Sequence, residues 1–330
     1  MKPRSRAEDT SAELLRLSSS DNLQDCTIKK HIILEAYIPT RQDTCLSHNI
    51  EDYPGGLIIP VDKPYRWTSA DVIRKIKFAS IRHFSKKNLK VGHAGTLDPL
   101  ATGVLLVCIG NATKLAESLQ AHDKEYVAGI SFGATTPSYD LEKEIDRFFP
   151  YSHITESAVR EALAGFIGEQ DQVAPLFSAK SVDGVRAYEL ARKIHKEGGS
   201  MDDAAKDLIR CSRIRISDLE LLSFSAAACM QANNPAEKTA PASSRTSGQS
   251  EDSTASSRIN VTDNSALGLP RAVVRIACSK GTYVRAFARD LGEALGSGAH
   301  LDSLQRSASG IFRVENALSV EQVIALLNCE

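Results

Sequence analysis

The sequence predicts an α+β protein in which a mixed central sheet is flanked by helices. Short apolar or alternating segments typical of strands recur along the chain, interspersed with segments that carry helix caps and helical spacing of apolar residues. The composition, 42% hydrophobic and 25% charged, is that of a globular protein. No internal repeat is visible, so a repeat architecture is not expected.

The strands are predicted from apolar runs of four to eight residues. The run at 104–107 is β-branched at both ends, which favours a buried strand. The segment 126–132 alternates apolar and polar residues, as a half-buried strand does. The other strands are predicted at 57–61, 214–216 and 272–278.

The helices are predicted from caps at their starts and glycines at their ends. Thr68 caps a helix that continues through Ala79. Thr155 opens a helix that runs to Ile167, with Gly168 past its end. Further helices are predicted at 116–119, 187–196 and 284–295, and after the capping box Ser319–Gln322.

Composition divides the chain into an N-terminal extension, residues 1–54, and one domain, residues 55–330. The extension is polar and carries no readable motif. Residues 226–268 are rich in Ala, Ser, Thr, Asn and Pro and almost lack large apolar side chains. Such a segment cannot bury enough surface to offset chain entropy, so we expect a low-complexity, disordered insertion within the domain.

Cysteine spacing and hydropathy indicate the compartment. The seven cysteines are widely spaced and form no C-x-x-C pair, so neither a disulfide framework nor a zinc site is predicted. No apolar segment approaches the length of a membrane span, and no signal sequence is visible at the N-terminus. A reducing cytoplasm is the expected location.

Residues 92–103, Gly-His-Ala-Gly-Thr-Leu-Asp-Pro-Leu-Ala-Thr-Gly, place Asp98 on a stiff loop just ahead of a strand. Pro99 disfavours helical backbone at Asp98, and catalytic groups are often carried on loops fixed by a scaffold. An Asp that merely stabilises the turn is the alternative. The stretch from Val61 to His93 holds nine Lys and Arg residues and two Asp residues. It predicts a positive field that suits a polyanion, unless these charges only solvate a helix face.

Three blocks together resemble the TruB family of pseudouridine synthases. They are 92–103, which matches the family's catalytic-aspartate motif, 123–126 followed by 133–136, and 278–285. Shorter matches lie at 61–64, 68–69, 182–188 and 296–301. The resemblance extends from about Gly55 to the C-terminus. It implies a mixed, mainly antiparallel central sheet flanked by helices, with an active-site cleft.

The resemblance implies a function as well. The family isomerises uridine-55 in the TΨC loop of tRNA to pseudouridine, without cofactor or metal. Asp98 is then the catalytic nucleophile or base, Arg285 its ion-pair partner, and Tyr126 stacks on the target base and assists removal of its C5 proton. By residue type alone, Arg285 would be assigned to the surface and Tyr126 to ordinary packing. The residues expected to bind the substrate, partly by holding the flipped uridine, are His93, Lys63, Thr96, Leu97, Tyr283 and Leu304.

The expected partner is the TΨC stem-loop of tRNA, bound by a monomer with no membrane and no obligatory protein partner. No C-terminal PUA-type RNA-binding domain is expected, which favours a stand-alone enzyme. The alternatives are a guide-RNA-dependent synthase acting on ribosomal RNA, a catalytically silent tRNA-binding folding helper, and a hydrolase. A hydrolase would want a second carboxylate beside Asp98. Lys180 and Gln305 depart from the family's pattern, so the resemblance does not imply RNA contacts at these two positions.

Overall fold

A nine-stranded sheet crosses the molecule. The computed structural model describes residues 36–175, 177, 181–182, 185–186, 211–227 and 259–329. The strands of this sheet are β1 (Leu57–Lys63), β2 (Val91–Ala94), β3 (Ala101–Ile109), β4 (Lys124–Phe132), β7 (Gly168–Gln172), β10 (Ser212–Ser225), β11 (Arg271–Cys278), β12 (Ala299–Ser309) and β13 (Phe312–Arg313). Their order is β1-β3-β12-β4-β11-β10-β7, with β2 also paired to β3 and β13 to β12. Among these described pairs only β3–β12 is parallel, which confirms the predicted mixed, mainly antiparallel sheet.

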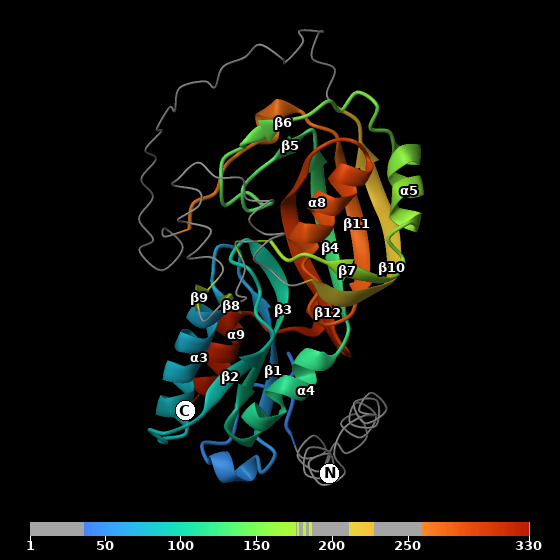
Figure 1. The fold of residues 1–330 in the computed structure, drawn as a ribbon. Coiled ribbons are helices and arrows are strands. Elements are labelled where there is room, and N and C mark those ends of the chain that lie inside the picture. The colour runs from blue at the N-terminus through green and yellow to red at the C-terminus, as the bar shows by residue number, and fades with distance from the viewer. Residues whose placement is uncertain are drawn as a thin grey trace.

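The helices lie against this sheet, and short strands pair outside it (Figure 1). The helices are α3 (Ser69–His83), α4 (Ala116–Ala121), α5 (Glu156–Ala164), α8 (Val284–Ala294) and α9 (Val320–Leu327). The 3-10 helices are η1 (Ile50–Asp52), η2 (Gly110–Leu115), η5 (Ser265–Leu267) and η6 (Val314–Asn316). The two separate hairpins pair β5 (Ala134–Thr135) with β6 (Arg147–Phe148) and β8 (Ser181–Val182) with β9 (Val185–Arg186).

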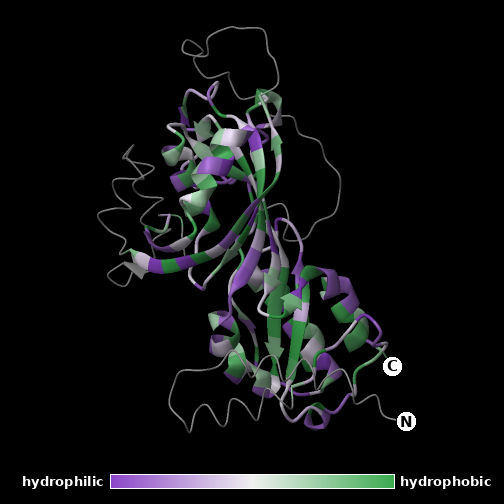
Figure 2. Ribbon diagram, turned by 90° about the vertical axis from the view of Figure 1, so that its right-hand side faces the viewer, coloured by the Kyte–Doolittle hydropathy of each residue, from purple (hydrophilic) through white to green (hydrophobic). Residues whose placement is uncertain are grey.

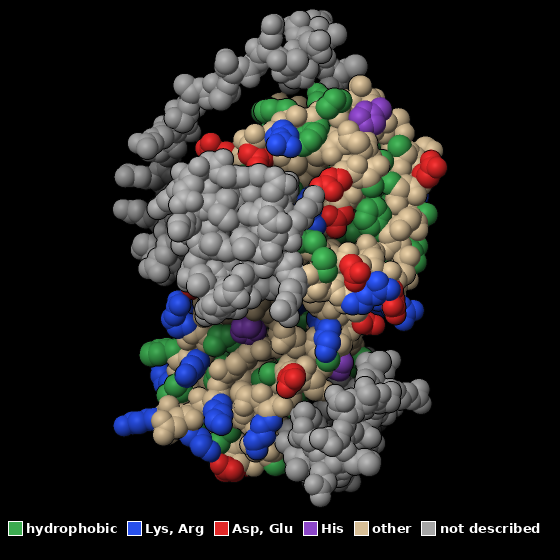
Figure 3. Space-filling model, viewed as in Figure 1, with side chains coloured by type: hydrophobic (Ala, Val, Ile, Leu, Met, Phe, Trp, Pro, Cys, Tyr) green, Lys and Arg blue, Asp and Glu red, His purple; other side chains and the backbone are tan. Residues whose placement is uncertain are grey.

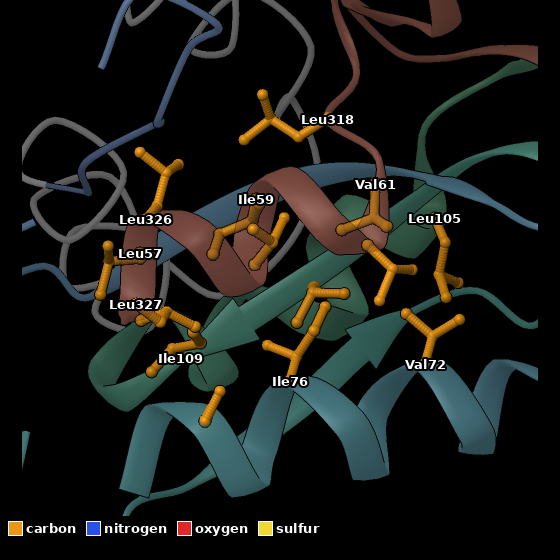
Figure 4. Packing of buried hydrophobic residues seen from close by; sticks show 14 of the residues in the cluster. Leu57, Ile59, Val61, Val72, Ile76, Leu105, Ile109, Leu318, Leu326 and Leu327 are labelled. Carbon is orange, nitrogen blue, oxygen red and sulfur yellow. The ribbon is translucent and has the colours of Figure 1, made fainter. Parts of the chain in front are cut away.

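The half of the sheet that contains β1 and β3 is covered on both faces. On one face, α3 and α9 pack against the strands through residues such as Ile76 and Leu326 (Figure 4). On the other face, η2 and α4 pack through Leu115 and Leu119. Because both faces are buried, β3 is almost continuously apolar, as the run at 104–107 predicts.

The other half of the sheet has one buried face. There α5 and α8 pack against β4, β10 and β11, and burial alternates along β11. Figure 2 shows apolar residues along the strands of both halves. Tyr126 on β4 and Leu304 on β12 contact the cores of both halves. The two halves therefore meet around these two side chains.

The predicted caps are confirmed where the structure describes them. Thr68 and Ser319 both form capping boxes, and the Thr155 side chain accepts from the third residue of α5. The end predicted for α5 is wrong. The helix stops at Ala164, and Ile167 is 53% exposed because β7 begins at the next residue. The helix predicted at 187–196 lies outside the described residues.

Residues 36–54 pack on the domain although their sequence carries no recognisable motif. Tyr37 bridges to Leu57 of β1, and Leu46 is buried against α9 and α3. Cys45 forms a disulfide with Cys329, near the other end of the chain, which contradicts the expectation of unpaired cysteines. The spacing of the cysteines in sequence gives no sign of this contact, because 284 residues separate the pair.

The last ten residues of the predicted insertion, 259–268, also have fixed contacts. The amide of Thr262 donates to the Leu141 carbonyl at 2.8 Å, and Arg66 donates to the Ile259 carbonyl at 2.8 Å. The ordered chain therefore resumes earlier than its composition indicates, and residues 228–258 lie outside the described part. No helix within the described ranges is long and apolar enough to span a membrane.

Candidate active site

The Asp98 loop connects β2 to β3 and is fastened from several sides. β2 pairs with the last residues of β3, and β12 pairs with its first residues. The loop therefore lies where the strand beside β3 changes from β2 to β12. The Ser69 hydroxyl accepts from the Leu97 amide at 2.9 Å and donates to the Leu97 carbonyl at 3.2 Å. The Pro99 carbonyl accepts from the Arg66 amide at 3.0 Å. The loop thus holds the Asp98 backbone in place between two anchored neighbours.

Asp98 forms the ion pair that the sequence predicts. Its Oδ2 lies 2.9 Å from Nε of Arg285, which reaches it from the second residue of α8. The Arg285 side chain is 6% exposed, whereas that of Asp98 is 39% exposed. Burial would lower the pKa of Arg285, but Asp98 and neighbouring carboxylates outweigh burial and raise it. The carboxylate is therefore held by a buried cation while one side stays open to solvent.

A second carboxylate, Asp140, lies on the same guanidinium. Its Oδ2 is 3.8 Å from Arg285 Nε, and its side chain is 9% exposed. The Ser138 hydroxyl and the Glu142 amide donate to its Oδ1 at 2.6 and 3.0 Å. Arg285 Nη1 also donates to the Ser138 carbonyl. Sequence reasoning missed Asp140, although it follows the quoted block 133–136 by only four residues.

Tyr126 stands on β4 directly opposite Arg306 of β12. Burial raises the pKa of Tyr126, while the nearby Arg306 guanidinium acts in the opposite direction. The ring lies between the two cores, and from its residue type and its position on a strand it would be assigned a packing role. The pairing of β4 with β12 therefore positions Tyr126 at the site, and the Asp98 loop does not.

An open cleft of about 680 Å³ adjoins these groups. This volume is typical of ligand sites. The predicted residues that line it are Thr96, Leu97, Asp98, Tyr126, Tyr283, Arg285 and Leu304. They come from the Asp98 loop, the β4–β12 pair and the start of α8, and the structure brings all seven together.

Two predicted substrate contacts do not line this cleft. Lys63 is fully buried, and its Nζ donates to the carbonyls of Pro64, Trp67 and Pro99 at 2.9, 2.6 and 3.1 Å. Burial lowers the pKa of Lys63 to about 8. Its prediction as a substrate contact is therefore wrong for this structure, and Lys63 instead fastens the Asp98 loop. His93 lies on β2 opposite Val107, and its Nδ1 has no hydrogen-bond partner among the described residues.

Positive charge gathers on α3 and the segment after it. Figure 3 shows Lys and Arg side chains in the lower half of this face, where α3 and β2 lie in Figure 1. Arg74 pairs with Asp71 and Lys86 with Glu51. Within residues 69–90, the exposed cations that form no ion pair with another described residue are Lys75, Lys77, Arg82, Lys87 and Lys90. We call these five residues the α3 basic face.

The described residues contain no group of three or more His, Cys, Asp or Glu side chains that could hold a metal ion. Asp98, Arg285 and Tyr126 line the cleft and place a carboxylate, a guanidinium and a phenol there. A carboxylate with an open side can act as a nucleophile or as a base. An aromatic ring beside it can stack on a planar substrate.

Comparison with known proteins identifies close relatives. A family model described as TruB family pseudouridylate synthase (N terminal domain) matches residues 82–233. The tRNA pseudouridine synthase B of Phocaeicola vulgatus is 44% identical over 270 residues, which cover 82% of this chain and 92% of that protein. The protein of the same name from Bacteroides thetaiotaomicron is 43% identical over the same coverage. A solved Cbf5-Nop10-Gar1 complex shares the fold, with a TM-score of 0.50 at 22% identity, covering 87% of this chain and 60% of that one.

Proposed function

Because this chain belongs to the TruB family of pseudouridylate synthases, we propose that it converts uridine-55 in the TΨC loop of tRNA to pseudouridine. The observation that carries the proposal is the Asp98–Arg285 ion pair at the wall of an open cleft. Relatives named tRNA pseudouridine synthase B match across most of the chain, which supports tRNA as the substrate.

The reaction rearranges one nucleotide and consumes no second reactant. The N1–C1′ bond breaks, the uracil turns, and C5 bonds to C1′. C5 loses its proton and N1 gains one, so atoms and electrons balance. Asp98 acts either as a nucleophile on the nucleotide or as a base toward a sugar proton, and both roles need the ionised carboxylate that Arg285 pairs with.

The uridine must leave the stacked loop before Asp98 can reach it. Flipping costs a few kcal/mol, which contacts in the cleft must offset. Tyr126 offers a ring for the base, and Leu304 an apolar side chain at the junction of the two cores. We assign to His93, which lies next to this region on β2, a contact with the RNA loop from which the uridine is flipped out. Phosphate contacts would come from the α3 basic face.

The geometry also bears on the alternatives. Asp140 is a second carboxylate near Asp98, as a hydrolase would want. It is nearly buried, however, and accepts hydrogen bonds from Ser138 and Glu142, so it is placed to hold Arg285 and not to protonate a leaving group. A silent folding helper would not need Asp98, Tyr126 and Arg285 together around one cleft. These contacts favour a pseudouridine synthase over a hydrolase or a silent helper, and the relatives named tRNA pseudouridine synthase B favour an enzyme that acts on tRNA over a guide-directed one.

The test is incubation of the protein with a uridine-labelled TΨC stem-loop, with no guide RNA or second protein, followed by nucleoside analysis. Pseudouridine at position 55 is expected. Asp98→Asn should yield none while binding the stem-loop as the unsubstituted protein does. Normal turnover by Asp98→Asn, or a requirement for a guide RNA, would refute the proposal.

A further inference from the structure

Arg306 is a buried cation that the proposed chemistry does not use. It lies on β12, near the middle of the sheet, and its side chain is 1% exposed. Within the described ranges, no carboxylate oxygen lies within 4.0 Å of its guanidinium. Burying a charge without an opposite charge is costly unless hydrogen bonds satisfy it. The partners of this guanidinium therefore indicate what it does.

Those partners flank Asp98 on both sides. Nε donates to the Val104 carbonyl at 2.7 Å, on the strand that follows the Asp98 loop. Nη2 and Nη1 donate to the carbonyls of Gly95 and Thr96 at 3.2 and 3.4 Å, where the loop begins. One rigid, planar group thus ties the start of the loop to the strand at its end.

The same residue stands directly opposite Tyr126 in the β4–β12 register, and both residues line the cleft. The backbone of Arg306 is itself fixed between both partners, because it pairs with Gly103 of β3 on one side and Tyr126 of β4 on the other. Gly103 has φ +97°, and a side chain there would clash with the Arg306 carbonyl. Arg306 therefore holds a fixed position between the strand of Asp98 and the strand of Tyr126.

We propose that Arg306 is a positioning residue for the isomerisation: its guanidinium fixes the Asp98 loop relative to Tyr126, the residue directly opposite it on β4. This inference rests on the proposed function of the site. Arg306 also lines the cleft, together with Tyr126 and Lys124. A lysine at this position keeps the charge but lacks the planar fork, so it cannot hold all the partners at once.

The test compares Arg306→Lys and Arg306→Gln with a control, Arg275→Gln. Arg275 lies on the neighbouring β11 and pairs with Glu125, Asp218 and Glu220, none of which belongs to the Asp98 loop. Single-turnover rates are measured with saturating TΨC stem-loop, alongside its Kd and the thermal midpoint of each variant. Arg306→Lys should remain folded, bind RNA within about threefold of the unsubstituted protein, and react about 100-fold more slowly. Arg306→Gln should be slower still, and Arg275→Gln should keep the full rate.

A double substitution separates positioning from plain stabilisation. If Arg306 fixes the Asp98 loop relative to Tyr126, Arg306→Lys should cost much less in a Tyr126→Phe background than in the unsubstituted protein. The inference is overturned if Arg306→Lys reacts within about twofold of the unsubstituted rate. The inference is also overturned if the rate of Arg306→Lys declines only as much as its RNA binding and folding do. The same holds if the rate losses of Arg306→Lys and Tyr126→Phe simply multiply in the double variant. An inactive unsubstituted protein would instead overturn the proposed function, and this inference with it.

Discussion

At the scale of single residues, Arg285 is the group on which the site depends. It faces Asp98 and Asp140 at 2.9 and 3.8 Å, and its own side chain is nearly buried. Without it, two carboxylates would remain close together with no cation between them. Like charges held close together repel, which would destabilise the folded site.

Arg285→Met should therefore lower both stability and turnover. Breaking a buried ion pair costs about 3–5 kcal/mol, and we expect about 3 kcal/mol here because Asp98 is 39% exposed. Urea unfolding at pH 7 measures this loss. Arg275→Met is the matched control, since two of its three partners, Asp218 and Glu220, are more than half exposed, and it should cost about 1 kcal/mol or less. Equal losses for the two variants would contradict this assignment.

Lys63 predicts a distinct pH dependence of stability. Burial lowers its pKa to about 8 from 10.5, so the folded protein binds this proton less tightly than the unfolded chain. Between about pH 8 and 10.5 the unfolded chain holds more protons, and stability rises with pH from this group. The gain should reach about 3 kcal/mol in total. Free energies of unfolding at about pH 7.5 and 10.5 should show this rise in the unsubstituted protein relative to Lys63→Met; parallel curves would refute it.

Local sequence identified Asp98 because glycines, a proline and a following strand surround it. Asp140 has no such signal. Its role arises from contact with Arg285, which is 145 residues away in the sequence and arrives on another element. Lys63 was misassigned for a similar reason, because its burial depends on three carbonyls that only the folded loop brings together.

At the scale of elements, β12 was not predicted, although it carries two residues that line the cleft, Leu304 and Arg306. β12 reads Ala-His-Leu-Asp-Ser-Leu-Gln-Arg-Ser-Ala-Ser, with no apolar run, and the sequence did not predict it. Most of its residues are buried, but several of these are polar, including His300, Arg306 and Ser309, so burial leaves no hydrophobic pattern here. The polar β7 escaped notice likewise, as a strand at the edge of the sheet. Strands with buried faces, such as β3 and β11, were predicted because burial leaves a hydrophobic pattern.

Two glycines of the Asp98 motif should respond very differently to substitution, because only Gly103 lies in the β3–β12 pair. Gly103→Ala forces a side chain into the Arg306 carbonyl at a positive φ, so it should cost at least about 2 kcal/mol and slow the reaction. Gly92→Ala, on β2, meets no atom within 4 Å and should change stability by less than about 0.5 kcal/mol. Thermal unfolding of both variants checks this contrast. A neutral Gly103→Ala would mean that the two strands are not closely paired.

At the scale of the whole molecule, the disulfide joins the two ends of the described chain. Cys45 lies in the segment that packs beside β1, and Cys329 follows α9, which packs against α3 in the same core. Cross-linking such distant positions restricts the unfolded chain. Cys45→Ser should therefore lower stability by about 2–4 kcal/mol under oxidising conditions and have no effect in excess reductant. Urea unfolding with and without reductant separates these outcomes, and an equal loss in both would show that the thiols do not pair.

Binding of a whole tRNA should also be governed by charge spread over the surface. Among the α3 basic face, Lys75, Lys77 and Arg82 lie on α3 itself and form no ion pair with a described residue. If they bind phosphates, Lys75→Gln, Lys77→Gln and Arg82→Gln together should weaken tRNA binding. They should also reduce the slope of log Kd against log salt by about 2–3, roughly 1 for each phosphate that is no longer neutralised. Filter-binding titrations from low to high salt give this slope.

The matched control removes three exposed arginines from other surfaces: Arg147→Gln, Arg160→Gln and Arg313→Gln. Both triple variants change net charge equally, so long-range attraction of tRNA falls by a similar amount. Only the α3 variant should lack the short-range phosphate pairing that sets the salt slope. Its rate at saturating tRNA should stay unchanged, since none of its residues lines the cleft. Equal slopes for the two triple variants would show that α3 attracts RNA only through net charge, and that the phosphates are bound elsewhere.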